Sequence, residues 1–258
     1  MAIVLLVLVG MIFYVRVQKK NPRFRVTFFN VGQGDAALVQ FNNGQKMLVD
    51  CGPDRKILSK LGEALPFYDR TIDFLVSTHP DLDHYGGCAD VLRRYNVKTI
   101  IINGKEKFDS YFKIWDKTLK NEGAEIKIIK KPENLTIAGT SLEILSPDDS
   151  LKIDSEKADG NNASIVFRLI NSDKQYLFTG DMEESLEKAL EQKYCLFNEL
   201  RCPALKSDVL KIGHHGSDSS SSWNFLKFVN PKQAIISVVK NNFGHPSLRV
   251  LRRLERIG

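Results

Sequence analysis

The stretch DFLVSTHPDLDHYGG, residues 73–87, reads as a short apolar strand that ends in a histidine and continues into an acidic turn. The turn contains two imidazoles and two carboxylates, at His79, Asp81, Asp83 and His84. Side chains at the end of a strand can converge on one point, and this mixture of nitrogen and oxygen ligands suits Zn²⁺ or Mn²⁺. A turn that only caps the following helix is the alternative, but the residue types, spacing and strand–turn–helix context together favour a metal site.

The other histidines also follow predicted apolar strands, in loops rich in Gly or Asp. His214 and His215 follow the strand DVLKIG and precede Gly216. Adjacent residues point in different directions, so one histidine can bind a metal while the other meets substrate or a supporting carboxylate. We predict His214 as the ligand. His245, in the turn FGHP, suits a proton donor or a phosphate contact, and a turn histidine without such a role is an equal alternative.

A further carboxylate ends the segment YLFTGD, residues 176–181. Gly180 allows a sharp turn, and one carboxylate can bridge two metals held about 3.5–4 Å apart. The alternative is that Asp181 caps a helix that starts at Met182.

Short apolar strands alternate with amphipathic helices, expected over residues 87–95, 108–122 and 183–194, from Arg23 to the end of the chain. No repeat or linker divides this part, which predicts one layered α/β domain over residues 23–258. With 43% hydrophobic residues in a chain of 258, disorder is excluded.

The N-terminal segment is apolar. Residues 2–15 carry no charge, and basic residues follow from Arg16. At about 1.5 Å per residue the segment gives roughly 21 Å of helix, short of a hydrocarbon core of ~30 Å. We predict an uncleaved membrane anchor over residues 1–20, with a buried strand as the alternative. The formal charge of +6 lies mainly here, since the first 25 residues hold five basic and no acidic residues.

Four cysteines are present, and no two of them form a CxxC pair, which excludes zinc-knuckle and thioredoxin-like sites. We expect small buried thiols. The alternative is a Cys195–Cys202 disulfide in an oxidising compartment.

These motifs, in this order, resemble the metallo-β-lactamase superfamily, and more narrowly the hydrolase domain of the ComEC-type competence proteins, which move transforming DNA across the bacterial membrane. The match also includes VGQGD at residues 31–35 and DCGP at residues 50–53. The combination of HPDLDHYGG with HHGS and GHP is specific to this branch. The resemblance implies an αββα four-layer sandwich, preceded by the short hydrophobic helix, and a further strand or two after Gly258. We therefore expect a domain truncated at its C-terminal end.

The resemblance also implies roles for individual residues. The metal ligands would be His79, Asp81, Asp83, His84, Asp181 and His214. The catalytic residues would be Asp83, His215 and His245, and substrate would contact Ser217, His215 and His245. Asn161 and Asn162 lie where the superfamily has a further histidine, and they could contact metal or substrate.

Two departures from the superfamily pattern affect the expected metal. Asp81 replaces a histidine, and Asn161 and Asn162 occupy the loop of another. Both changes move the donor set from nitrogen towards oxygen, which favours Mn²⁺ over a strict Zn²⁺ site. We expect one or two divalent ions.

The expected function is a metal-dependent hydrolase, a phosphodiesterase or nuclease linked to DNA uptake, which uses metal-activated hydroxide. The alternatives are a hydrolase of small esters, lactones or thioesters, and a non-enzymatic DNA-guiding module with a decayed metal site. DNA or another phosphodiester is the expected partner, together with the membrane through the N-terminal helix, and no protein partner can be deduced. The basic residues after the helix favour the cytoplasmic side for that flank, whereas the resemblance implies an extracellular domain.

Overall fold

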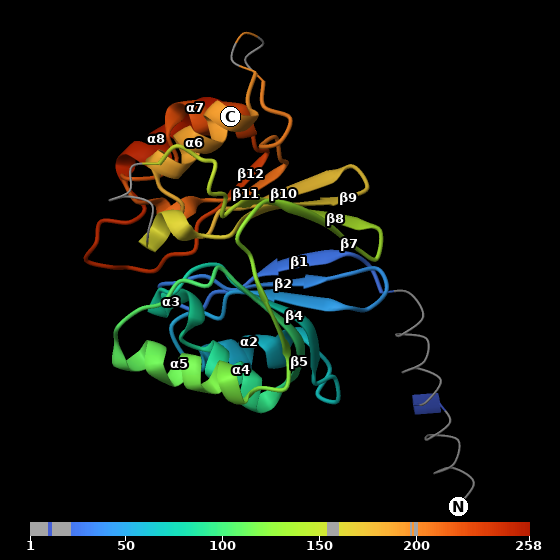
Figure 1. Ribbon diagram of the computed structural model, residues 1–258. Coiled ribbons are helices and arrows are strands. Elements are labelled where there is room, and N and C mark those ends of the chain that lie inside the picture. The colour runs from blue at the N-terminus through green and yellow to red at the C-terminus, as the bar shows by residue number, and fades with distance from the viewer. Residues whose placement is uncertain (1–9, 12–21, 154–159, 197, 199–200) are drawn as a thin grey trace, which may run out of the picture.

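The computed structural model describes residues 10–11, 22–153, 160–196, 198 and 201–258 (Figure 1). The predicted membrane anchor over residues 1–20 falls outside these ranges, apart from Gly10 and Met11, and it stays a prediction. Within the ranges, no helix has both the length and the apolar character that crossing a membrane requires.

Two mixed six-stranded sheets pack face to face at the centre of the described chain (Figure 1). The first sheet has the order β1 (Arg25–Phe28), β2 (Ala37–Gln40), β3 (Lys46–Val49), β4 (Thr71–Ser77), β5 (Asn96–Ile102) and β6 (Glu125–Ile128). The second has the order β12 (Gln233–Ile235), β11 (Val209–Lys211), β10 (Lys174–Phe178), β9 (Val166–Asn171), β8 (Thr140–Ser146) and β7 (Glu133–Ile137).

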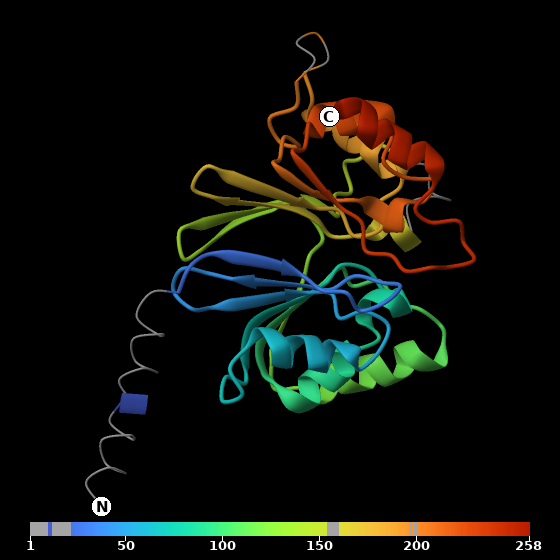
Figure 2. The same ribbon diagram turned by 180° about the vertical axis from the view of Figure 1, so that it is seen from behind.

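Helices cover the outer face of each sheet, as Figures 1 and 2 show from opposite sides. The first sheet is covered by α2 (Lys56–Ala64), α3 (Leu82–Tyr85), α4 (Cys88–Arg94) and α5 (Ser110–Asn121). The second is covered by α6 (Glu184–Tyr194), α7 (Trp223–Val229) and α8 (Leu248–Ile257). The four-layer αββα arrangement confirms the predicted fold class.

The layers follow from the alternation of side chains along each strand. In β2, Leu38 joins the core beneath the helices of the first sheet, whereas Ala37 and Val39 join the core between the two sheets. In β10, Leu177 packs beneath the helices of the second sheet, and Phe178 faces the core between the sheets. Both faces of these strands are therefore buried, which explains their nearly continuous apolar sequences.

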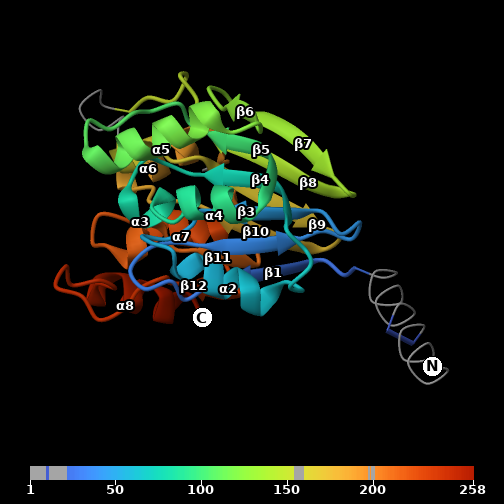
Figure 3. The same cartoon turned by 90° about the horizontal axis from the view of Figure 1, so that it is seen from below.

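The strand directions bring the functional loops together. Strands β3, β4, β5 and β6 are parallel neighbours, as are β10, β11 and β12. The carboxyl ends of parallel strands meet at one edge of a sheet, where α/β proteins place their sites. Figure 3 shows α3 and the loop before α8 at the same end of the molecule.

Some elements differ from the sequence prediction. Helices α2, α7 and α8 were not predicted, and strand β12 is short, with its last residue at Ile235. Helix α7 has the sequence WNFLKFV, whose aromatic residues have a low intrinsic helix propensity. Burial of Phe225 and Phe228 in the core of the second sheet stabilises it nevertheless.

The cysteines form two disulfides, Cys51–Cys88 and Cys195–Cys202. The expectation of free buried thiols is therefore wrong, and the alternative pairing of Cys195 with Cys202 is confirmed. The first disulfide joins the loop after β3 to the start of α4, on either side of the predicted metal segment.

Candidate metal centre

The first half of the site is the end of β4 together with α3. His79 follows the strand, Asp81 immediately precedes the helix, and the helix carries Asp83 and His84. His79 and His84 are buried, whereas the side chains of Asp81 and Asp83 are 27% and 31% exposed. This half therefore presents two buried imidazoles behind two carboxylates that solvent can reach.

Asp50, at the end of β3, fixes the orientation of His84. Its Oδ2 lies 2.9 Å from Nδ1 of His84 and accepts a hydrogen bond from Thr78 Oγ1 at 2.8 Å, and its Oδ1 accepts one from Thr78 N at 2.8 Å. With Nδ1 engaged, Nε2 of His84 faces the centre of the site. Asp50 was not among the predicted site residues, although its position at the end of a strand was a usable signal.

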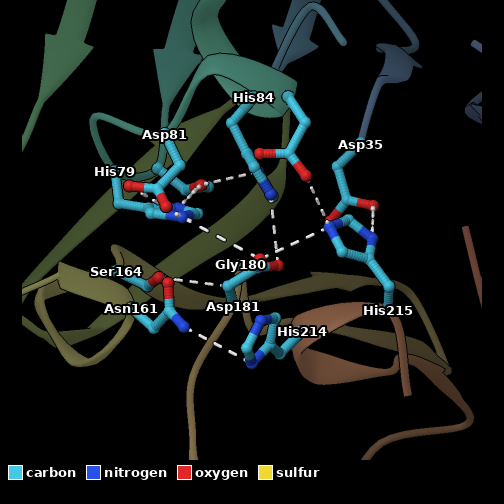
Figure 4. Close-up of polar contacts among 12 residues, drawn as sticks. Asp35, His79, Asp81, His84, Asn161, Ser164, Gly180, Asp181, His214 and His215 are labelled. Carbon is cyan, nitrogen blue, oxygen red and sulfur yellow. Dashed lines mark hydrogen bonds and ion pairs between the residues drawn. The ribbon is translucent and has the colours of Figure 1, made fainter. Parts of the chain in front are cut away.

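The second half begins at the end of β10, where the chain turns sharply at Gly180. This residue has φ 53°, and a Cβ added to it would lie 2.7 Å from Ser164 Oγ. The same hydroxyl accepts a hydrogen bond from the backbone N–H of Asp181 at 3.1 Å. Glycine is thus required for the turn that aims the Asp181 carboxylate at the histidines (Figure 4). Helix α6 starts at Glu184 with Glu183 as its N-cap residue, so Asp181 does not cap a helix that starts at Met182.

His214 and His215 lie in the short 3₁₀ segment Gly213–Gly216 after β11, both with left-handed backbone angles, φ 45° and 51°. The two side chains diverge, as predicted. His215 is buried, with Nε2 at 3.0 Å from Asp83 Oδ2 and 3.4 Å from Asp181 Oδ2. His214 instead contacts Glu183 Oε1 at 3.2 Å, outside the cluster (Figure 4). The geometry therefore favours His215, not His214, as the ligand from this segment.

Four side chains from the two halves form one cluster. Asp83, His84, Asp181 and His215 each contribute a ligand atom, and these atoms all lie within 4.8 Å of one another. Asp181 is central, because its Oδ1 lies 3.2 Å from His84 Nε2 and its Oδ2 lies 4.0 Å from His79 Nε2.

These residues fit a divalent cation. The Nε2 atoms of His79 and His84 and Oδ1 of Asp181 are buried without a hydrogen bond, and the 3.2 Å between His84 Nε2 and Asp181 Oδ1 is an ion pair only when the imidazole is protonated. Buried polar atoms without a partner are costly in proteins, and imidazole nitrogens beside carboxylates are a donor set that binds transition metals. The cluster would hold the ion through Asp83, His84, Asp181 and His215, with His79 and Asp81 at its side.

The charges within the cluster also indicate a cation-binding site. Burial alone would lower the pKa of His84, but the charges of Asp181 and Asp50 outweigh it and raise that pKa well above its usual value. Burial opposes the charged form of His215 as well, yet Asp181 and Asp83 raise its pKa to about 9. Without an ion, protons on these two histidines balance the carboxylates, so a cation would replace protons when it binds.

The remaining predicted residues lie around this cluster. Asn161 donates from Nδ2 to Glu183 Oε1 at 3.2 Å, and Asn162 Oδ1 accepts from Glu183 N at 3.1 Å. Ser217 accepts a hydrogen bond from the backbone of Ser219, so it shapes the loop after His215. The assignments of these three predicted residues to metal or substrate stay predictions.

His245 lies above His214, with 5.3 Å between the ring centroids. Burial lowers its pKa, helped by the charges of His214 and His215, and its Nδ1 has no hydrogen-bond partner. Beside Asp81, Lys107 Nζ lies 2.6 Å from Oδ1 of that carboxylate. A neutral imidazole and a cation thus flank the cluster.

Comparison with known proteins agrees with this geometry. The model of the metallo-beta-lactamase superfamily matches residues 29–238. The chain belongs to this superfamily. Its members are generally metal-dependent hydrolases, and the two-sheet fold and the histidine–aspartate cluster described above are its features in this chain.

Individual relatives are competence proteins. The chain is 30% identical over 249 residues to ComE operon protein 3 of Bacillus subtilis, covering 90% of this chain and 30% of that protein. It is 30% identical over 255 residues to competence protein ComA of Neisseria gonorrhoeae, covering 98% and 33%. The chain thus spans about a third of each relative, and the predicted resemblance is confirmed.

A solved structure shows the same fold. YhfI of Bacillus subtilis, a metallo-beta-lactamase fold protein, superimposes with a TM-score of 0.56 at 12% identity, covering 91% of this chain and 93% of that one.

Proposed function

We propose that this chain is a metal-dependent phosphodiesterase that cleaves DNA during DNA uptake. The observation that carries the proposal is a cluster of largely buried metal ligands that solvent reaches at Asp81 and Asp83, flanked by a lysine and by exposed aromatic side chains. The relatives named as competence proteins support a DNA substrate.

The cluster supports hydrolysis at a phosphodiester. A divalent ion held by its four residues would supply a Lewis acid and a nucleophilic water at neutral pH. The Lys107 ammonium, beside Asp81, is placed to contact a phosphate oxygen. His245, whose pKa is lowered by burial, can take up and pass on a proton during the reaction.

Two exposed phenylalanines favour a nucleic acid over a small ester. Phe108, adjacent to Lys107, is 98% exposed, and Phe243, whose ring centroid lies 5.9 Å from that of His245, is 73% exposed. Figures 1 and 3 show that the β5–α5 and β12–α8 loops, which carry them, lie at the edge occupied by α3. Aromatic side chains beside a basic residue are typical stacking surfaces for nucleotide bases.

The experiment compares two substrates. We expect the full chain, supplied with Mn²⁺ or Zn²⁺, to cleave DNA oligonucleotides and bis(p-nitrophenyl) phosphate. The double substitution Phe108→Ala and Phe243→Ala should lower cleavage of DNA by about tenfold or more, since stacking contributes ~1–3 kcal/mol per base, and leave cleavage of the small diester unchanged.

Phe67→Ala is the matched control. Phe67 is 78% exposed but precedes β4, whereas His79 follows that strand, so it lies at the opposite edge of the sheet. Equal losses in the control and the double variant would remove the argument for base stacking. A metal-loaded chain that cleaves esters, lactones or thioesters but not DNA would contradict the proposal, as would a chain that binds DNA but no metal.

A further inference from the structure

A buried ion pair joins the two sheets directly behind the metal centre. Asp35, just before β2, and Lys211, the last residue of β11, lie with Oδ2 and Nζ 2.6 Å apart, and their side chains are only 8% and 4% exposed. Burial of two charges costs desolvation energy that their attraction often fails to recover, so such a pair is a poor source of stability. Its position therefore calls for another explanation.

On the Asp35 side, the pair is tied to the ligand Asp83. The backbone N–H of Asp35 donates to Asp83 O at 3.1 Å. A Cβ added to the preceding Gly34 would lie 2.2 Å from the same oxygen, so glycine is needed for this approach. The VGQGD segment is thus held against the backbone that carries Asp83.

On the Lys211 side, the pair is tied to the ligand His215. Lys211 is followed at once by the segment that carries this histidine, and its Nζ also donates to Ile212 O at 2.6 Å. The second oxygen of Asp35, Oδ1, has no hydrogen-bond partner and lies 3.7 Å from Nδ1 of His215 (Figure 4). That Nδ1 lies 2.9 Å from Ser237 O, which leaves Nε2 to face Asp83.

We propose that Asp35 and Lys211 are positioning residues for the metal centre. Asp83 comes from the first sheet and His215 from the second, and the ion pair fixes the distance between the two segments that carry them. The Lys211 ammonium also neutralises the Asp35 carboxylate, which would otherwise add a further unbalanced negative charge beside His215. The inference concerns metal binding at this centre and does not depend on the substrate proposed above.

The test separates metal binding from stability. Asp35→Asn and Lys211→Met each leave a buried charge without its partner, so both should lower stability and lower the affinity for Mn²⁺ or Co²⁺ by about 10- to 100-fold, the range seen when groups behind metal ligands are removed. The double variant leaves no unpaired charge. We expect its unfolding midpoint to return to the wild-type value or above, while its metal affinity stays low and the visible spectrum of bound Co²⁺ stays altered.

Lys46→Met with Asp69→Asn is the matched control. This pair, 3.1 Å apart, lies at the opposite end of the first sheet, because Lys46 begins β3 whereas Asp50 follows it. The control should change stability but not metal affinity, measured by isothermal titration calorimetry on the full chain. Recovery of both stability and metal affinity in the Asp35/Lys211 double variant would overturn the inference. A wild-type chain that binds no metal would overturn both the inference and the proposed function, whereas metal binding without DNA cleavage would overturn only the latter.

Discussion

The two halves of the metal centre are built in different ways. The half on the first sheet takes its groups from one continuous segment, His79–His84, behind which lies the buried Asp50 carboxylate. The half on the second sheet takes Asp181 and His215 from separate loops, each with a left-handed residue at or next to the ligand, whereas in the first half the left-handed residue is the supporting Asp50, with φ 56°. The first half is thus defined by residue types and their spacing, and the second by the path of the chain.

The largest expected effect is a loss of metal affinity on substitution of Asp181, which tests whether the second half supplies the central ligand. Asp181→Asn should lower metal affinity by more than about 100-fold, beyond the effect of removing groups behind the ligands, because both carboxylate oxygens face histidine nitrogens. Asp81→Asn should lower metal affinity by less than about tenfold, since Asp81 is partly exposed and paired with Lys107. Titration calorimetry on both variants decides the order, and a larger loss in Asp81→Asn would reverse our view of the two halves.

The next effect compares the groups that support each half. Asp50→Asn should lower metal affinity by about 10- to 100-fold, because an amide cannot replace both carboxylate contacts to Thr78 and His84. Ser164→Ala removes one neutral hydrogen bond, donated by the backbone of Asp181. This loss should weaken metal binding by only about 1 kcal/mol. Equal losses of metal affinity in the two variants would show that the charged Asp50 supports its half no more strongly than the neutral Ser164 supports the other.

A third comparison isolates the backbone of the second half. Gly180→Ala should destabilise the chain by about 2–3 kcal/mol, through the left-handed φ and the collision with Ser164, and metal affinity should fall with it. Gly244 also has a positive φ, 79°, but nothing lies within 4 Å of an added Cβ. Gly244→Ala should therefore lower the free energy of unfolding by only about 1 kcal/mol. Urea unfolding of both variants measures the difference in stability between them.

The last comparison concerns the pH dependence of stability on the side of the second sheet. Burial, helped by the charge of Glu184, raises the pKa of Glu191 on α6 to about 7. The folded chain then binds more protons than the unfolded chain between about pH 4.5 and 7, so this group makes stability fall as pH rises through that window. Glu191→Gln should flatten the decline and be more stable than wild type at pH 8 but not at pH 4.5. Glu255→Gln, at an exposed position of α8, should leave the profile unchanged.

The sequence predicted the first half of the site better than the second, for a physical reason. A strand, a turn and a short helix place His79 to His84 by local geometry alone. The choice between His214 and His215 depends on φ values of 45° and 51° at adjacent residues, which their residue types do not indicate. The Cys51–Cys88 disulfide joins residues 37 positions apart and depends on how the loop after β3 meets α4, so spacing could not reveal it.

The division of ligands between two sheets has a thermodynamic consequence. A cation bound by Asp83 and His84 from one sheet and by Asp181 and His215 from the other requires both sheets to be folded and docked. The ion therefore binds the native state alone, and a free concentration one hundred times its dissociation constant would add about 2.7 kcal/mol to the free energy of unfolding. The ion would link the two sheets, and the free metal concentration would set part of the free energy of unfolding of the folded chain.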